Sequence, residues 1–417
     1  MDRTAKDGGG RALSPWARTL ALWAVAGAVF GVFNAVYWPL RAAAPPVSPL
    51  RPFQPDPAAG PFGLGGWAVC ALAGLTALLV TAAATPLCRR LALRLGVLDH
   101  PTESRKVHGA AVPYLGGLAM HAAFLSALLS VQAFAPAYSH PLFYPAAAVG
   151  TAVLLLGLAD DAMGLPSWLK LAVELGLGVL LYHWGFGVRE LQAPLGGVLH
   201  VGWLAVAVAA LWLAGLMNAV NFIDGLDGLA AGLAALCAAT LLAVGLRNGQ
   251  VISAVLMAGL IGAAAGFLLF NFHPASIFMG DAGALFLGFV LAAATLVEEQ
   301  KGAAVMALAV PMTALAVPLA DTVLSFIRRL RRAREGRFFE ADRRHLHHRL
   351  LALGLGHRGA VLALYAVSAV MAPIAWVVDT LDPARRYPLL LLPPVILTAG
   401  VVALRYFEGQ RGKQSKQ

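Results

Sequence analysis

Twelve apolar stretches of about 17 to 25 residues divide the chain. A helix rises about 1.5 Å per residue, so about 20 apolar residues cross the roughly 30 Å hydrocarbon core of a bilayer. Lipid offers the backbone no hydrogen bonds, so such spans must be helices. We therefore predict an all-α polytopic membrane protein. The predicted spans are 18–38, 64–88, 114–134, 143–159, 166–184, 201–217, 228–246, 251–270, 281–297, 303–326, 359–378 and 388–406.

The composition agrees with this class, because 59% of the residues are hydrophobic and only 12% are charged, whereas a soluble domain is nearer half and a quarter. The first span could be a signal peptide. Its apolar run of about 20 residues exceeds the usual 7–15, so we expect a retained helix. We divide the chain into an extra N-terminal helix with a Pro-rich loop (1–63), a transmembrane domain of about eleven helices (64–406) and a basic tail (407–417).

Lysine and arginine predict the orientation. If the N-terminus is cytoplasmic, 24 of the 31 basic residues fall on inner segments or inner span ends, among them Lys170. This is the positive-inside pattern, and it accounts for the net charge of +10 without nucleic acid. Both termini are then expected on the cytoplasmic side of the cell membrane. On the outer side, residues 188–201 could form a small hairpin.

Polar residues gather on one side of this predicted bundle. Five clusters follow spans that run from the outer to the inner side: 105–117, 158–165, 218–228, 271–288 and 337–350. A carboxylate at the bilayer centre costs about 2.5–3.5 kcal/mol, so we expect the acidic groups at the inner span ends, in a shared cleft. A lone aspartate there is more often a helix cap, but five on one side favour a cytoplasmic active site. The five are Asp160, Asp161, Asp224, Asp227 and Asp281.

The stretch NAVNFIDGLDG (218–228) carries a carboxamide or carboxylate at every third residue: Asn218, Asn221, Asp224 and Asp227. On a helix, positions three apart differ by about 60°, so Asn221 with Asp224, and Asp224 with Asp227, can share a target. Oxygen donors without histidine or cysteine nearby suit a hard cation, Mg²⁺ or Mn²⁺. Asp281, in a second Gly-rich stretch, offers another ligand of this kind.

A basic segment at 328–349 is the expected counterpart for an anionic substrate. Its arginines alone are more often a topology signal than a site. The histidines are less ordinary: His345 and His348 share a helix face while His347 points away, which is not a zinc spacing. We predict donors to substrate phosphate oxygens in this segment. The candidate substrate-binding residues are Arg343, Arg344, His345, His347 and His348, together with His108 and Asn218.

Four motifs in this order resemble the polyprenyl-phosphate N-acetylhexosamine-1-phosphate transferases: LADDAMGL, NAVNFIDGLDGLAAG, NFHPASIFMGDAGALFLG and DRRHLHHRLL. Within that family the chain is similar to the undecaprenyl-phosphate GlcNAc-1-phosphate branch. The resemblance, over about 64–406, implies that undecaprenyl phosphate attacks the β-phosphorus of UDP-GlcNAc. UMP then leaves, and a lipid-linked pyrophosphoryl sugar for cell-envelope polysaccharides remains.

The resemblance also implies site roles, with Mg²⁺ as the expected cofactor and Mn²⁺ as a substitute. The implied metal ligands are Asp281, Asn221 and Asp224. The implied catalytic residues are the acidic pair Asp160 and Asp161, with Asp224, Asp227, Asn271 and Lys106. The loop that contacts the nucleotide-sugar corresponds to His345, His347 and His348. One departure is Ala284, where the family pattern has a serine hydroxyl beside the metal-binding loop.

Three alternatives stay open from the sequence. The donor could be UDP-MurNAc-pentapeptide, although HLHH departs from the three consecutive histidines of that branch, or it could be another UDP-HexNAc. An ion-coupled transporter would also place carboxylates in the membrane, but nearer the midplane. A homodimer is a further expectation.

Overall fold

The computed structural model of the protein describes residues 14–43, 64–99, 111–188, 190–192, 198–297, 312–313, 315–333, 346–381 and 388–414. The first half contains α1 (Pro15–Ala43), α2 (Leu64–Leu95), β1 (Leu98–Asp99), β2 (Val112–Pro113), α3 (Gly116–Phe134), α4 (Phe143–Met163), α5 (Ser167–His183), β3 (Glu190–Gln192) and β4 (Val198–His200). The second half contains α6 (Leu204–Ile223), α7 (Leu229–Arg247), α8 (Val251–Asn271), α9 (Gly280–Leu296), α11 (Ala316–Ala333), α12 (Leu346–Ala352), α13 (His357–Thr380) and α15 (Leu392–Gln414).

The predicted all-α membrane architecture is confirmed. Within the described ranges, eight helices are long and apolar enough to cross a membrane, and α9 and the first part of α15 are shorter apolar helices. The predicted span at 303–326 differs, because α11 begins at Ala316 and continues into a basic stretch that ends at Ala333. Residues 298–311 of that region lie outside the described part, so the count of twelve spans stays a prediction.

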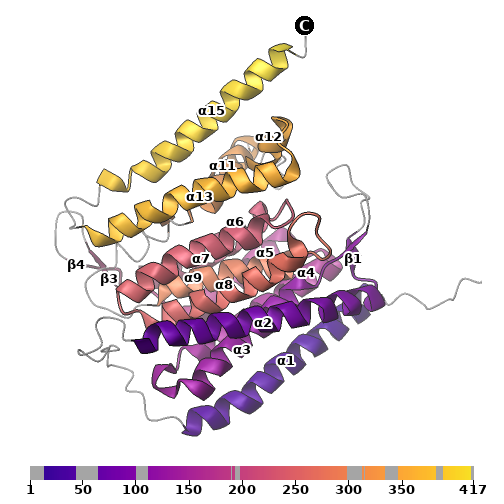
Figure 1. The fold of residues 1–417 in the computed structure, drawn as a ribbon, viewed down its shortest axis with the longest axis vertical. Coiled ribbons are helices and arrows are strands. Elements are labelled where there is room, and N and C mark those ends of the chain that lie inside the picture. Colours follow the sequence, from indigo (N-terminus) through magenta and orange to yellow (C-terminus); the bar gives the residue numbers. More distant parts are fainter. Residues whose placement is uncertain are drawn as a thin grey trace, which may run out of the picture.

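The two ends of the bundle differ in what they carry. The helices run side by side across the view of Figure 1, with β1 at one end and β3 and β4 at the other. β3 and β4 pair antiparallel, with Leu191 opposite Leu199, so the hairpin expected at 188–201 is confirmed. At the opposite end, β1 pairs with β2, and Tyr114 bridges to Phe278 in the loop before α9. Within the described residues, this second end brings together parts of the polar clusters at 158–165, 218–228 and 271–288.

Helix α9 lies at the centre of the bundle and is packed by α3, α4, α6, α7 and α8. Nearly all of its side chains are buried, which an uninterrupted apolar sequence requires. Two glycines let α3 and α4 reach its first turn: a Cβ at Gly117 would lie 2.4 Å from the backbone N of Gly283, and one at Gly157 would lie 2.3 Å from Cα of Ala282. The start of α9 is therefore held closely from two sides.

The extra N-terminal helix α1 is packed into the bundle against α3 and α4. Trp23 donates from Nε1 to the backbone oxygen of Leu155 at 3.0 Å, and Tyr37 contacts Tyr144 with ring centroids 5.8 Å apart. Arg18 donates to the backbone oxygen of Gly96 at 3.1 Å, just before β1. Helix α1 thus supports the turn that leads to the polar end of the bundle.

Candidate active site

A pocket of about 460 Å³ opens at the end of the bundle that carries β1. The loop between α6 and α7, the loop between α8 and α9, the β1–β2 region and the first residue of α13 all line it. The pocket brings together five of the residues predicted from the sequence: Asp161, Asp224, Asp227, Asn271 and Asp281. Segments more than a hundred residues apart therefore meet where the sequence analysis placed a cleft.

Asp161 holds the first turn of α9. Its carboxylate accepts hydrogen bonds from the backbone N–H groups of Asp281, at 2.8 Å, and Ala282, at 3.2 Å. These N–H groups have no partner inside the helix, and a negative charge is favourable at a helix N-terminus. Gly280 has a φ of +71°, and a Cβ there would lie 2.5 Å from Asp161 Oδ2. Asp161 thereby positions Asp281.

Lys170 links the predicted acidic pair to Asp281. From α5, its Nζ lies 2.5 Å from Oδ2 of Asp160 and 2.8 Å from Oδ2 of Asp281. The side chain of Asp281 is 36% exposed, against 11% for Asp160 and 16% for Lys170, so Asp281 faces the pocket. Asp160 also accepts a hydrogen bond from the N–H of Leu165 at 2.8 Å. In the sequence, Lys170 was interpreted only as a charge at a span end, so this role was not predicted.

The predicted metal ligands meet at the end of α6. Asp224 is the C-cap of that helix. Burial and the neighbouring carboxylates of Asp281 and Asp227 raise the pKa of Asp224 from 3.8 to about 7. The amide nitrogen of Asn221 is buried without a hydrogen-bond partner. The carboxylates of Asp224 and Asp281 beside the buried amide of Asn221 fit a hard divalent cation and the phosphate oxygens that it carries.

Asn271 ties two of the pocket loops together. The side chain is almost fully buried at the end of α8. It accepts a hydrogen bond from the N–H of Gly228 at 3.0 Å and donates one to the backbone oxygen of Ile277 at 3.0 Å. Tyr365 on α13 donates to the backbone oxygen of Gly228 at 2.5 Å. This geometry assigns Asn271 a positioning role, and its expected catalytic role stays a prediction.

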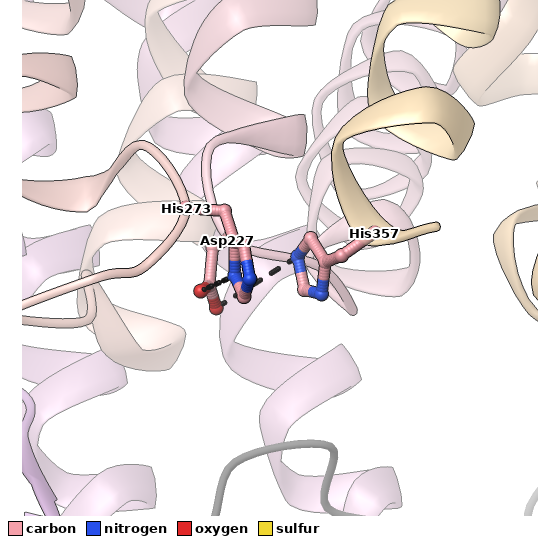
Figure 2. A group of neighbouring side chains, drawn as sticks. All are labelled: Asp227, His273 and His357. Atoms are coloured by element: carbon pink, nitrogen blue, oxygen red, sulfur yellow. Dashed lines mark hydrogen bonds and ion pairs between the residues drawn. The ribbon is translucent and has the colours of Figure 1, made fainter. Parts of the chain in front are cut away.

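Asp227 pairs with two histidines that the sequence analysis did not select. Figure 2 shows His273, from the loop before α9, and His357, at the start of α13, side by side against the Asp227 carboxylate. Nδ1 of His273 lies 2.7 Å from Oδ2 of Asp227, and Nε2 of His357 lies 4.0 Å from Oδ1. The two rings are stacked with centroids 4.0 Å apart. The sequence signal for His273 was the His-Pro step inside the NFHPASIFMGD motif, whereas His357 lies outside the motifs.

Asn218, on α6, is not among the residues that line the pocket. Its Nδ2 donates to the carboxylate of Glu174, and to the backbone oxygen of Ala214 at 2.9 Å. Glu174 is fully buried one turn after Lys170 on α5. The structure therefore gives Asn218 a buried partner that the sequence analysis missed, and its substrate-binding role stays a prediction.

The basic segment falls largely outside the described residues. The predicted roles of six residues are untested, because these residues or their side chains lie outside the described part: Lys106, His108, Arg343, Arg344, His345 and the side chain of His347. His348 lies on α12, whose first residue, Leu346, donates its N–H to Asp321 at 3.0 Å.

The departure from the family pattern at Ala284 lies within α9, where this side chain is buried. The two hydrogen bonds to Asp161 hold the adjoining turn without a hydroxyl at that position.

Comparison with known proteins identifies the family of this chain. Residues 143–299 match the family described as Glycosyl transferase family 4. The chain is 34% identical to the probable undecaprenyl-phosphate N-acetylglucosaminyl 1-phosphate transferase of Bacillus subtilis, over 72% of this chain and 82% of that protein. It is 37% identical to the decaprenyl-phosphate N-acetylglucosaminephosphotransferase of Mycolicibacterium smegmatis, over 80% of this chain and 87% of that protein.

A transferase from a related branch of the family matches over a shorter region. The phospho-N-acetylmuramoyl-pentapeptide-transferase of Latilactobacillus sakei is 40% identical, but over 35% of this chain and 49% of that protein. The two matches that span most of both chains are thus to N-acetylglucosamine phosphotransferases. The chain belongs to the polyprenyl-phosphate N-acetylhexosamine-1-phosphate transferase family.

Proposed function

We propose that this protein transfers N-acetylglucosamine 1-phosphate from UDP-GlcNAc to undecaprenyl phosphate, or to a polyprenyl phosphate of similar length, and releases UMP. The observation that carries the proposal is the match to two N-acetylglucosamine phosphotransferases over 82% and 87% of their lengths. Transfer of phospho-MurNAc-pentapeptide is the second candidate, favoured by the shorter match to that branch. The HLHH sequence argues against it. An ion-coupled transporter has no support among these relatives.

The reaction is an in-line displacement at phosphorus. An oxygen of the lipid phosphate forms a bond to the β-phosphorus of the UDP-sugar, and the bond from that phosphorus to the UMP oxygen breaks. Such transfers need positioning and charge neutralisation more than covalent chemistry. A phosphate monoester, with a second pKa near 6, is already mostly dianionic at neutral pH, so a general base would add little. We therefore assign Asp160 and Asp161 to orientation.

The contacts of the pocket support that assignment. Both oxygens of Asp161 already accept backbone hydrogen bonds, and Asp160 is bonded to Lys170. The ammonium of Lys170 is the cation that these contacts bring nearest to the exposed carboxylate of Asp281. The N-terminus of α9 adds the positive end of a helix dipole, which favours phosphate. Mg²⁺, held by Asp224, Asp281 and Asn221, would supply charge stabilisation to the transferring phosphoryl group.

The setting completes the proposal. We place the pocket on the cytoplasmic face of the cell membrane, because that is where the positive-inside pattern orients it and where UDP-sugars are dissolved. The product would be a lipid-linked precursor for a cell-envelope polysaccharide. Arg343, Arg344 and the histidines of the adjoining segment would contact the nucleotide. A homodimer stays a prediction.

The test is UMP release by the purified protein in detergent with undecaprenyl phosphate. UDP-GlcNAc, UDP-GalNAc and UDP-MurNAc-pentapeptide are compared, each with and without Mg²⁺. We expect Mg²⁺-dependent UMP from UDP-GlcNAc, and none from Asp281→Asn despite an unchanged elution profile on gel filtration. UMP release from UDP-MurNAc-pentapeptide alone would support the second candidate function, transfer of phospho-MurNAc-pentapeptide. No UMP from any donor, with lipid and metal verified, would refute the proposed reaction.

A further inference from the structure

Asp227, His273 and His357 form a cluster whose composition differs from that of the hard-cation ligands. One ligand atom of each lies within 4.8 Å of the other two. The three residues come from three separate segments: the loop after α6, the loop before α9 and the first turn of α13. All three line the pocket. The arrangement therefore joins segments that are otherwise distant in the chain.

The hydrogen bonding of this cluster is incomplete. His273 is paired with Asp227 through Nδ1, and the N–H of Ala275 donates to the same carboxylate oxygen at 3.1 Å. His357 differs, because its side chain is 9% exposed and both of its ring nitrogens are buried without a hydrogen-bond partner. Buried polar atoms in a folded protein are normally paired with protein, water or a ligand. The structure thus leaves a nitrogen donor directed into a polar pocket.

We propose that Asp227, His273 and His357 bind a borderline transition-metal ion of the Zn²⁺ class, at a site separate from the Mg²⁺ ligands Asp224 and Asp281. Two imidazoles and one carboxylate are a ligand set that suits Zn²⁺ and its neighbours, whereas Mg²⁺ prefers oxygen alone. The ion would replace the proton between His273 and Asp227, and it would bind a ring nitrogen of His357, which has no hydrogen-bond partner. A fourth position remains for water or a substrate oxygen, as in open zinc sites.

The geometry requires a small adjustment. Around a tetrahedral ion with bonds of about 2.0–2.1 Å, ligand atoms lie roughly 3.3 Å apart, against separations of up to 4.8 Å here. Rotation of the His357 ring from its stacked position would close the difference. The His273 backbone is held in place, since Arg358 donates to its carbonyl oxygen from Nε at 3.1 Å and from Nη2 at 2.9 Å. The site is therefore largely preformed on two of its three sides.

Binding would have a structural consequence that does not depend on turnover. One ion would join the α6–α7 loop, the α8–α9 loop and α13, and a ligand that binds only the folded state raises the melting temperature by mass action. We expect Zn²⁺ to raise the melting temperature of the metal-stripped protein even when Mg²⁺ is in large excess. This effect would be seen whether or not the protein is a transferase, so the failure of one proposal is distinguishable from the failure of the other.

The decisive experiment uses Co²⁺ as a spectroscopic probe of the full-length protein, purified in detergent with a histidine-free affinity tag. Tetrahedral Co²⁺ with imidazole ligands absorbs visible light far more strongly than octahedral Co²⁺ with oxygen ligands. We expect a strong band at one equivalent of Co²⁺, which equimolar Zn²⁺ removes and excess Mg²⁺ does not. His357→Ala, His357→Gln and His273→Ala should each weaken Zn²⁺ binding at least about tenfold. His183→Ala, which alters an exposed histidine at the end of α5, should bind like the wild type.

Three spectroscopic results would overturn the proposal. They are the absence of a strong band, its removal by Mg²⁺, and its persistence in both His273→Ala and His357→Gln proteins. His357→Gln keeps a polar side chain of similar size, so it separates loss of a metal ligand from loss of the fold. Gel filtration of each variant verifies that comparison. A Zn²⁺-induced rise in melting temperature that the His357→Gln substitution leaves unchanged would also place the ion elsewhere.

Discussion

Replacing Asp161 by asparagine separates the two roles that this residue can have. As a general base, Asp161 would act on the lipid phosphate. As a positioning group, it holds the N–H groups of Asp281 and Ala282 at 2.8 and 3.2 Å. Asparagine has almost the same shape but no negative charge, and it offers one acceptor oxygen instead of two. The substitution therefore perturbs the two hydrogen bonds without opening a cavity.

The expected magnitude follows from those two N–H groups. Whichever way the amide is turned, one backbone N–H faces an NH₂ group and loses its partner, which costs about 1–3 kcal/mol. Loss of the charge at the helix N-terminus removes about 0.3–1 kcal/mol more. We expect the free energy of unfolding to fall by about 1–4 kcal/mol. A shift of Asp281 by about 1 Å can then lower turnover about 100-fold.

The assay is UMP release over a range of Mg²⁺ concentrations and pH values, together with thermal unfolding of the same preparations. If Asp161 positions Asp281, the Asp161→Asn protein needs more Mg²⁺ for half-maximal rate and melts at a lower temperature, while its pH profile keeps its shape. If Asp161 were a general base, the Asp161→Asn protein would instead keep its Mg²⁺ requirement and melting temperature, and its pH profile would change shape. An unchanged Mg²⁺ requirement and melting temperature, with loss of one limb of the pH profile, would refute the positioning role.

Three further predictions follow from the same contacts. Gly280→Ala should abolish most activity, because its Cβ would lie 2.5 Å from Asp161 Oδ2. The control is Gly164→Ala: Gly164 has a φ of +66° and no atom within 4 Å of an added Cβ, so this substitution should cost only the backbone strain of about 1–2 kcal/mol. Equal UMP-release rates for the two variants would refute the clash. Because the pKa of Asp224 is raised from 3.8 to about 7 without metal, its contribution to stability should be lost as pH rises through that window. Mg²⁺ affinity should rise with pH over the same window by up to about tenfold per unit. Calorimetric Mg²⁺ titrations should show a weaker pH dependence for Asp224→Asn. Lys170→Met leaves two carboxylates without their cation, so Mg²⁺ should raise the melting temperature of this variant more than that of the wild type.

The membrane helices could be predicted because length and hydropathy are properties of each segment alone. The span expected at 251–270 matches α8 (Val251–Asn271). The predicted ends at 159 and 217 were less accurate, because α4 runs to Met163 and α6 to Ile223. Intrahelical hydrogen bonds continue through polar residues until a glycine such as Gly164 can adopt a positive φ. Asp160 and Asp161 are therefore helical residues, which an apolar count placed outside the span.

The partners in the site could not be predicted in the same way. In the sequence, Glu174 and Lys170 are isolated polar residues in an apolar segment. Their contacts with Asn218 and Asp281 depend on how α5 packs beside α4 and α6. His273 and His357 are 84 positions apart, and only the meeting of a loop with the start of α13 brings their rings together. Periodicity reports the face of one helix, and it carries no information about which helix lies opposite.

The electrostatics of the pocket predict the order in which Mg²⁺ and the UDP-sugar bind. Lys170 offsets part of the charge of Asp160 and Asp281, yet Asp224 still has its pKa raised to about 7 by burial and by the other carboxylates. Without metal, Asp224 is therefore only partly ionised at neutral pH, while the neighbouring carboxylates still disfavour further negative charge. A UDP-sugar adds further negative charge, so its pyrophosphate would be repelled unless a cation came first or with it. On this argument Mg²⁺ is required for donor binding as well as for turnover, and equilibrium dialysis of UDP-GlcNAc with and without Mg²⁺ should show that dependence before any UMP is formed.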